Sequence, residues 1–162
     1  MDSFDQLGLL AEISATLLGF VAVFIVLSRG DGRFAESDRH FIQALVQSSV
    51  FAVLLALIPR ALSLYGFDVS VWKIATIVAI IVGSGIMVLM ARAQMSMSRE
   101  EASKIHWGWH VSSWGMGFAA AGLLFLGLVQ SAYAAAFYVS AASIMVVLAL
   151  WSFVAVVFRR FF

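Results

Sequence analysis

The stretch LLAEISATLLGF, residues 9–20, is apolar enough to lie in lipid, yet it carries a glutamate, Glu12. Ionisable residues in membrane-spanning helices are costly, and they usually face the bundle interior or a water-filled cavity. The stretch therefore predicts a membrane-spanning helix. It also predicts that the Glu12 carboxylate holds a proton, pairs with a cation or touches water.

The composition of the whole chain agrees with a membrane location. Of its 162 residues, 63% are hydrophobic and 12% are charged, and the mean hydropathy is +1.01. Soluble domains are about half apolar and about a quarter charged. A soluble domain of this size has too much exterior to bury so much apolar surface. We therefore expect the lipid bilayer to be the first partner of this chain.

Charge and cysteine content exclude several other classes of function. The formal net charge is only +1, so we expect no nucleic-acid partner. The absence of cysteine excludes disulfides, thiolate metal sites and cysteine nucleophiles. The first six residues, MDSFDQ, lack the basic character of a cleaved signal peptide, so we expect the first apolar segment to be retained as a span.

Five apolar segments are long enough to cross the hydrocarbon core, which takes about 20 helical residues. They are Leu7–Leu27, Phe41–Leu64, Val71–Met90, Trp109–Gln130 and Ala132–Phe158. Segments in lipid must satisfy their own backbone hydrogen bonds, which favours helices of this length. The sequence thus predicts an all-α, polytopic bundle: one transmembrane domain over residues 1–162, with short loops and no extramembrane domain.

The distribution of basic residues predicts how this bundle is oriented. If the N-terminus lies outside the cell, eight basic residues fall on the cytoplasmic side: Arg29, Arg33, Arg39, Arg92, Arg99, Lys104, Arg159 and Arg160. Only Arg60 and Lys73 then lie toward the outer face. Cytoplasmic loops are enriched in Lys and Arg, so we expect an N-out, C-in protein. The pattern resembles small proteins of the bacterial inner membrane, and no motif identifies a family.

Glu12 and Arg60 are predicted to lie at similar depth on consecutive antiparallel helices. We expect an ion pair between them in the outer leaflet, with Lys73 as a competing partner. The alternative is that the Arg60 side chain extends to the headgroups while Glu12 sits in interfacial water.

Glu12 also belongs to a polar, small-residue face of the first predicted helix. The members of this face recur every three or four residues: Asp5, Gly8, Glu12, Thr16 and Gly19. A second such face runs along the fourth predicted helix through Gly108, Ser112, Gly115, Ala119 and Gly122. Small residues let membrane helices approach closely, so both faces predict packing contacts within one chain or between chains.

Histidines and amides gather at the predicted cytoplasmic boundary. His106 and His110, four residues apart, would suit Zn²⁺ if a further ligand such as His40 converged on them, but the metalloprotease motif is absent. Gln47 needs a hydrogen-bond partner, either on another helix or in a hydrated vestibule. We expect no enzyme activity and no cofactor, because no nucleophile–base pair or nucleotide loop is present.

Two functions remain open from the sequence. One is a homo-oligomeric channel in which Asp5, Glu12 and Thr16 of the first helix line a cation path. The other is a non-conducting scaffold, assembly factor or regulatory subunit that binds other membrane proteins through its small-residue faces. The direction in which Glu12 points should distinguish them.

Overall fold

The computed structural model describes residues 2–28, 36–66, 71–103 and 105–161, and side chains within 2–26, 38–66, 71–103 and 105–158. The described residues form helices and no strand, as the sequence predicts. In chain order the elements are α1 (Ser3–Ser28), α2 (Glu36–Leu64), α3 (Val71–Met95), α4 (Arg99–Ser103), α5 (Trp107–Val129), η2 (Ser131–Tyr133) and α6 (Ala134–Phe161).

The five long helices coincide with the five predicted spans. Each is long and apolar enough to cross a membrane, so the chain is a small multi-pass membrane protein. The predicted bounds of the last two spans leave only Ser131 between them, which requires a tight turn, and the structure has the short 3₁₀ helix η2 there. At their other ends the helices extend past the predicted spans, as α3 does by continuing to Met95. The all-α bundle is therefore confirmed.

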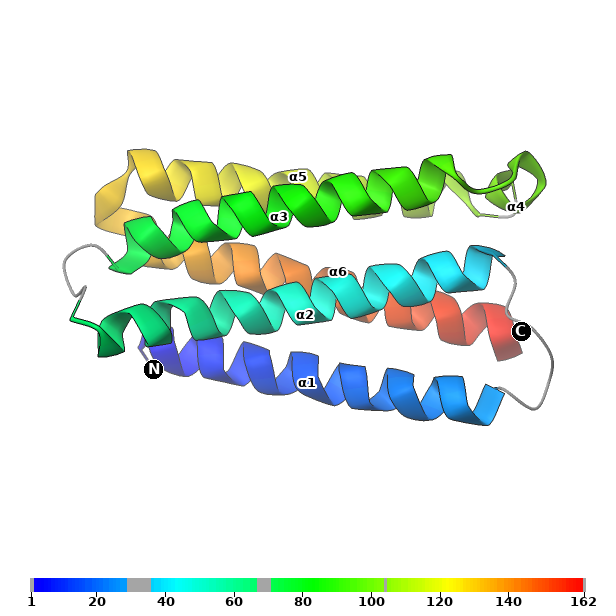
Figure 1. The fold of residues 1–162 in the computed structure, drawn as a ribbon, viewed down its shortest axis with the longest axis horizontal. Helices are drawn as coiled ribbons and strands as arrows, with labels where there is room; N and C mark the ends of the chain where they lie inside the picture. Colours follow the sequence, from blue (N-terminus) through cyan, green and yellow to red (C-terminus); the bar gives the residue numbers. More distant parts are fainter. Residues whose placement is uncertain (1, 29–35, 67–70, 104, 162) are drawn as a thin grey trace.

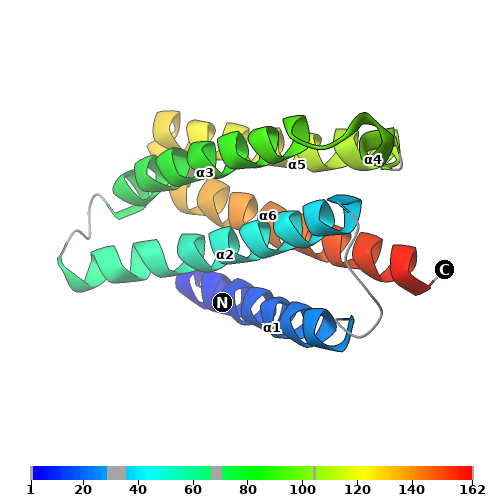
Figure 2. The same ribbon diagram turned by 45° about the vertical axis from the view of Figure 1, so that its right-hand side comes forward.

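The helices form three layers (Figures 1 and 2). Helices α2 and α6 make the central layer, α3 and α5 cover one side of it, and α1 alone covers the other. The apolar spans of α2 and α6 are 50% and 44% buried, against 17% for each of the other three. A single helix on one side leaves much of its own surface uncovered.

Small side chains explain why α2 and α6 occupy the centre. The buried small residues of these two helices are Ala44, Ser48, Ser49, Ala52 and Ala56 on α2, and Ala134, Ala141, Ala142, Ala149 and Ser152 on α6. In lipid, where apolar helices gain little from leaving the solvent, close van der Waals packing between small residues drives helix association. Larger side chains such as Leu55 and Tyr138 fill the space around them.

The termini lie at opposite ends of the bundle (Figure 1), as an odd number of crossings requires. We call one end the basic end, because the exposed side chains of Arg39, Arg92 and Arg99 lie there. The opposite end, where α1 begins, carries Arg60 and Lys73 and is called the N-terminal end. That the basic end faces the cytoplasm remains a prediction.

Candidate functional site

The polar face of α1 points away from the bundle. The buried face of helix α1 consists of Leu7, Ser14, Leu17 and Val21, which pack toward α2 and α6. Opposite these residues on the helix lie the exposed Asp5, Glu12, Thr16 and Gly19. Glu12 is therefore near the centre of the uncovered surface of α1, and we call these four exposed residues the α1 outer face.

Glu12 also lies close to the middle of its helix. The 26 residues of α1 span about 39 Å, more than the roughly 30 Å of the hydrocarbon core. Glu12 is only about 5 Å from the midpoint along the helix axis. Thr16 donates a hydrogen bond from Oγ1 to the Glu12 carbonyl at 2.8 Å, which leaves the carboxylate free. Among the described residues, nothing pairs with that carboxylate.

Arg60 does not form the ion pair that the sequence suggested. Its Nη2 donates to the carbonyl oxygen of Phe4 at 2.9 Å and lies against Gly8. Phe4 is eight residues before Glu12, so the guanidinium bonds about 12 Å nearer the N-terminal end than the Glu12 backbone. The long side chain of Arg60 thus extends toward the N-terminal end of the bundle, away from Glu12. Lys73 is also exposed, and it bonds to neither Glu12 nor Arg60.

The second predicted packing face, on α5, also points outward. Gly115, Ala119 and Gly122 are exposed, and a Cβ atom added at either glycine would meet nothing within 4 Å. Ser112 is half-buried, and its Oγ donates to the Trp109 carbonyl of its own helix at 3.0 Å. Gly115 and Gly122, like Gly19 on α1, make no close contact with another helix in the described part of the chain. Any packing role for them would have to be with another molecule.

The histidines are held separately. His106 precedes α5 and caps it, because its Nδ1 accepts a hydrogen bond from the Gly108 backbone N–H at 3.1 Å. Nδ1 of His110 bonds to Nε2 of Gln94 at 2.9 Å, and the His40 ring lies 6.4 Å from the His110 ring. No group of three or more potential metal ligands occurs among the described residues.

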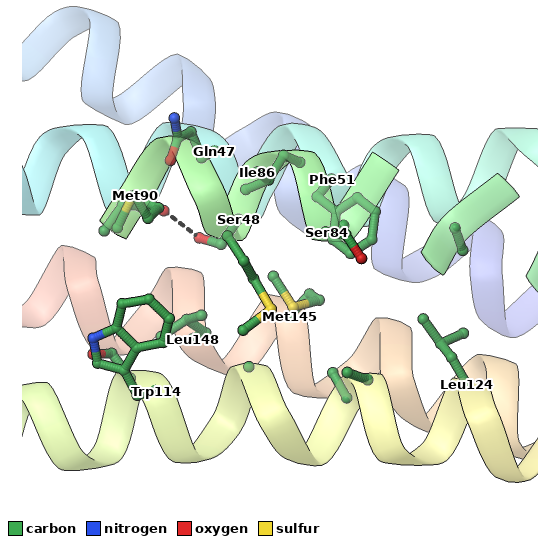
Figure 3. A pocket seen from close by; sticks show the side chains of 18 of the residues that line it. Gln47, Ser48, Phe51, Ser84, Ile86, Met90, Trp114, Leu124, Met145 and Leu148 are labelled. Atoms are coloured by element: carbon green, nitrogen blue, oxygen red, sulfur yellow. Dashed lines mark hydrogen bonds between the residues drawn. The ribbon is translucent and has the colours of Figure 1, made fainter. Parts of the chain in front are cut away.

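A cavity of about 250 Å³ lies between α3 and α5 on one side and the central layer on the other. Figure 3 shows Gln47 and Trp114 near one end of it, Leu124 near the other, and Met145 between them. The Gln47 end is toward the basic end of the bundle. The cavity is thus polar at one end and apolar along most of its length.

Four buried polar atoms at the polar end have no hydrogen-bond partner within the described part of the chain. They are Nδ1 and Nε2 of His40, Oε1 of Gln47 and Nε1 of Trp109. The side chains of His40 and Trp109 are only 4% and 6% exposed, and their rings meet edge to face at 5.2 Å. An unpaired buried donor or acceptor costs about 1–3 kcal/mol, so a hydrogen-bond partner from a water molecule or a ligand would stabilise each of these atoms.

Gln94 fixes the neighbouring wall of the cavity. Its Oε1 accepts a hydrogen bond from Nε1 of Trp114 at 3.1 Å, and its Nε2 bonds to His110. Both ends of the amide are therefore used, and α3 is tied to α5 at this level. Gln94 does not join the unpaired cluster.

Trp109 and Gln94 could not be selected from the sequence, which predicts a need for a hydrogen-bond partner only at Gln47. A tryptophan near a membrane boundary is typical of an interfacial belt. The burial of Trp109 becomes visible only when α2 and α5 are packed together, because the His40 and Phe41 rings cover it. No protein-family model, curated protein or solved structure matches this chain.

Proposed function

We propose that this membrane protein is a homo-oligomer in which the α1 helices surround a shared axis and line a cation path. The observation that supports the proposal is the position of Glu12, at the centre of the α1 outer face and near mid-helix. A carboxylate in that position would face hydrocarbon in a monomer, which is energetically unfavourable.

A ring of identical chains removes this cost. Closed symmetry brings the same face of every chain to one axis, where Glu12 carboxylates can share water and cations. Rings of acidic side chains are a common basis of cation selectivity. Asp5 and Thr16 lie on the same face and add oxygen atoms toward each end of such a path.

The path would run between chains and not through one chain. Helix α1 alone forms one outer layer of the bundle, so its outer face lies away from the centre of the chain (Figure 2). The cavity between α3, α5 and the central layer is lined by no residue of α1. Conduction past Glu12 therefore requires more than one copy.

A non-conducting scaffold or regulatory subunit is the alternative function. The exposed small residues Gly115, Ala119 and Gly122 on α5 favour it, because they offer a second surface for a membrane helix on a different layer. In this case Glu12 would pair with a cationic side chain of another membrane protein. Such a protein would assemble partners and carry no ions.

Cation flux into liposomes tests the proposal. The full-length chain should conduct, and Glu12→Gln should lower its cation flux about tenfold, as expected if the carboxylates stabilise the permeating ion by about 1.4 kcal/mol. The oligomer should remain intact on size-exclusion chromatography. Asp38→Asn removes the same charge from the start of α2 and is the matched control, with unchanged flux expected.

Two outcomes would contradict conduction. An intact wild-type oligomer that passes no ions would favour the scaffold. A conducting oligomer whose flux and selectivity are the same with Glu12→Gln would place the path elsewhere.

A further inference from the structure

The cavity has the hydrogen-bonding character of a site for a small polar head. The Trp109 N–H can only donate, the Gln47 Oε1 can only accept, and the neutral His40 ring can do one of each. A ligand head beside the His40 and Trp109 rings, which lie 5.2 Å apart, can bond to both if it accepts and donates hydrogen bonds. A hydroxyl group does both.

The same lining favours an uncharged ligand. None of the residues around the cavity is an aspartate, glutamate, lysine or arginine. A charged head in such a site would be desolvated without a counter-charge, which is costly. The headgroups of phospholipids, which carry phosphate, do not suit it.

The position of the exposed lining residues indicates that the ligand enters from the membrane. The exposed lining side chains are Ser84 on α3 and Ala121 and Phe125 on α5. Ser84 and Ala121 lie in the middle part of their helices, at the level of the hydrocarbon core, and Phe125 lies one turn beyond Ala121. A ligand that reaches the cavity between α3 and α5 at this depth must be soluble in lipid.

The apolar part of the cavity suits an aromatic ring. Met87, Met90 and Met145 contribute thioethers, and Phe51 and Trp114 contribute rings. Methionine sulfur makes favourable contacts with aromatic rings. A dry cavity of about 150 Å³ in another protein binds benzene, so about 250 Å³ accommodates a substituted ring.

From these features we propose that the cavity binds a neutral, membrane-soluble phenol or hydroquinone. Its hydroxyl group bonds at the polar end to the adjacent His40 and Trp109 rings, which lie 5.2 Å apart. Its ring lies among the methionines, and any alkyl chain leaves between α3 and α5 into the lipid. The site is separate from the α1 outer face and does not depend on the proposed conduction.

The test uses the purified full-length protein in mild detergent and three probes of similar shape: 4-hexylphenol, hexylbenzene and 4-hexylcyclohexanol. Binding is measured as the saturable rise of the thermal unfolding midpoint with probe concentration. We expect 4-hexylphenol to bind at least about fivefold more tightly than hexylbenzene, the value of one net hydrogen bond. The cyclohexanol, which has the hydroxyl but no aromatic ring, should also bind more weakly.

Matched variants locate the binding. Trp109→Phe keeps an aromatic ring against Phe41 but removes the N–H, and it should weaken 4-hexylphenol binding about fivefold. Gly117 borders the cavity and has open space beside it, so Gly117→Leu should fill the cavity and abolish binding. Gly122→Leu adds the same side chain on α5 away from the cavity and should leave binding unchanged.

Four results would overturn the proposal. Equal binding of hexylbenzene and 4-hexylphenol would show an apolar cavity with no role for the polar cluster. Equal binding of the cyclohexanol would remove the aromatic assignment, and retained binding by Gly117→Leu would place the site elsewhere. No saturable effect of any probe would indicate that the cavity holds water only.

Discussion

The α1 outer face and the internal cavity both contain polar groups without partners, but they differ in what could satisfy them. Glu12 lies on an exposed surface, where only something outside the chain can reach it. His40 and Trp109 are buried, and only a molecule small enough to enter the cavity can reach them. The first arrangement favours association with another chain, and the second favours a small ligand.

This difference follows from the three-layer arrangement of the helices (Figure 1). On one side of the central layer two helices, α3 and α5, share the surface and leave a space beneath them. On the other side α1 packs alone, so its far face has no neighbour in the chain. A membrane protein with both features can assemble through one side and bind a ligand on the other.

The largest expected effect is on cross-linking between chains. The protein has no cysteine, so each single-cysteine variant reports on one position only. If α1 helices meet around an axis, Thr16→Cys should form disulfide-linked dimers as the main product in membranes under mild oxidation. Gel electrophoresis without reducing agent measures the yield.

Ile81→Cys is the control for that experiment. Ile81 is 66% exposed and lies near the middle of α3, on the other side of the central layer. It should give only background dimers. Similar yields at both positions would mean random collision in the membrane, and α1 would then have no special role in association.

Much of the fold could be predicted from the sequence because each helix contributes its own signal. A run of about 20 apolar residues must satisfy its backbone hydrogen bonds internally, wherever it sits in the bundle. The five spans and the tight turn before α6 were correctly predicted on that basis. The distribution of basic residues further predicts which helix ends lie on the same side of the membrane.

The faces that pack could not be predicted in the same way. Small residues occur at helical spacing on several faces, and spacing alone does not show which face meets a neighbour. Gly115 on α5 and Ala136 on α6 point outward, whereas the small residues Thr76 and Ala79 on α3 are buried. The buried face of α6 lies instead around Ala141 and Ala142, opposite small residues of α2.

The direction of the Arg60 side chain could not be predicted for a related reason. Helix periodicity predicts the positions of the two backbones but not the direction of a long side chain. Arg60 turns toward the start of α1, where the backbone carbonyl of Phe4 accepts its hydrogen bond. That direction depends on the absence of a side chain at Gly8, since a Cβ there would lie 2.8 Å from Nη2.

A smaller effect should separate the tightly packed centre from the cavity. Ala52 on α2 is fully buried in the main core, so Ala52→Leu should lower the free energy of unfolding by about 1–3 kcal/mol through overpacking. Ala121→Leu makes the same change at the mouth of the cavity, where it should change that free energy by no more than about 0.5 kcal/mol. Unfolding in mixed micelles with increasing SDS measures both. A large loss of unfolding free energy with Ala121→Leu would mean that the protein is packed as tightly around Ala121 as around Ala52.

The smallest expected effect is the coupling between Glu12 and Arg60. Because their side chains do not meet, the losses of unfolding free energy from Glu12→Ala and Arg60→Ala should add to within about 0.5 kcal/mol. A coupling above about 1 kcal/mol would restore the ion pair suggested by the sequence. Gly8→Ala with Arg60→Ala is the positive control, because an added Cβ would displace the guanidinium from Phe4 and cost stability only while Arg60 is present. Additivity in the first pair and coupling in the second would together show that Arg60 holds the end of α1 and leaves Glu12 free for a partner outside the chain.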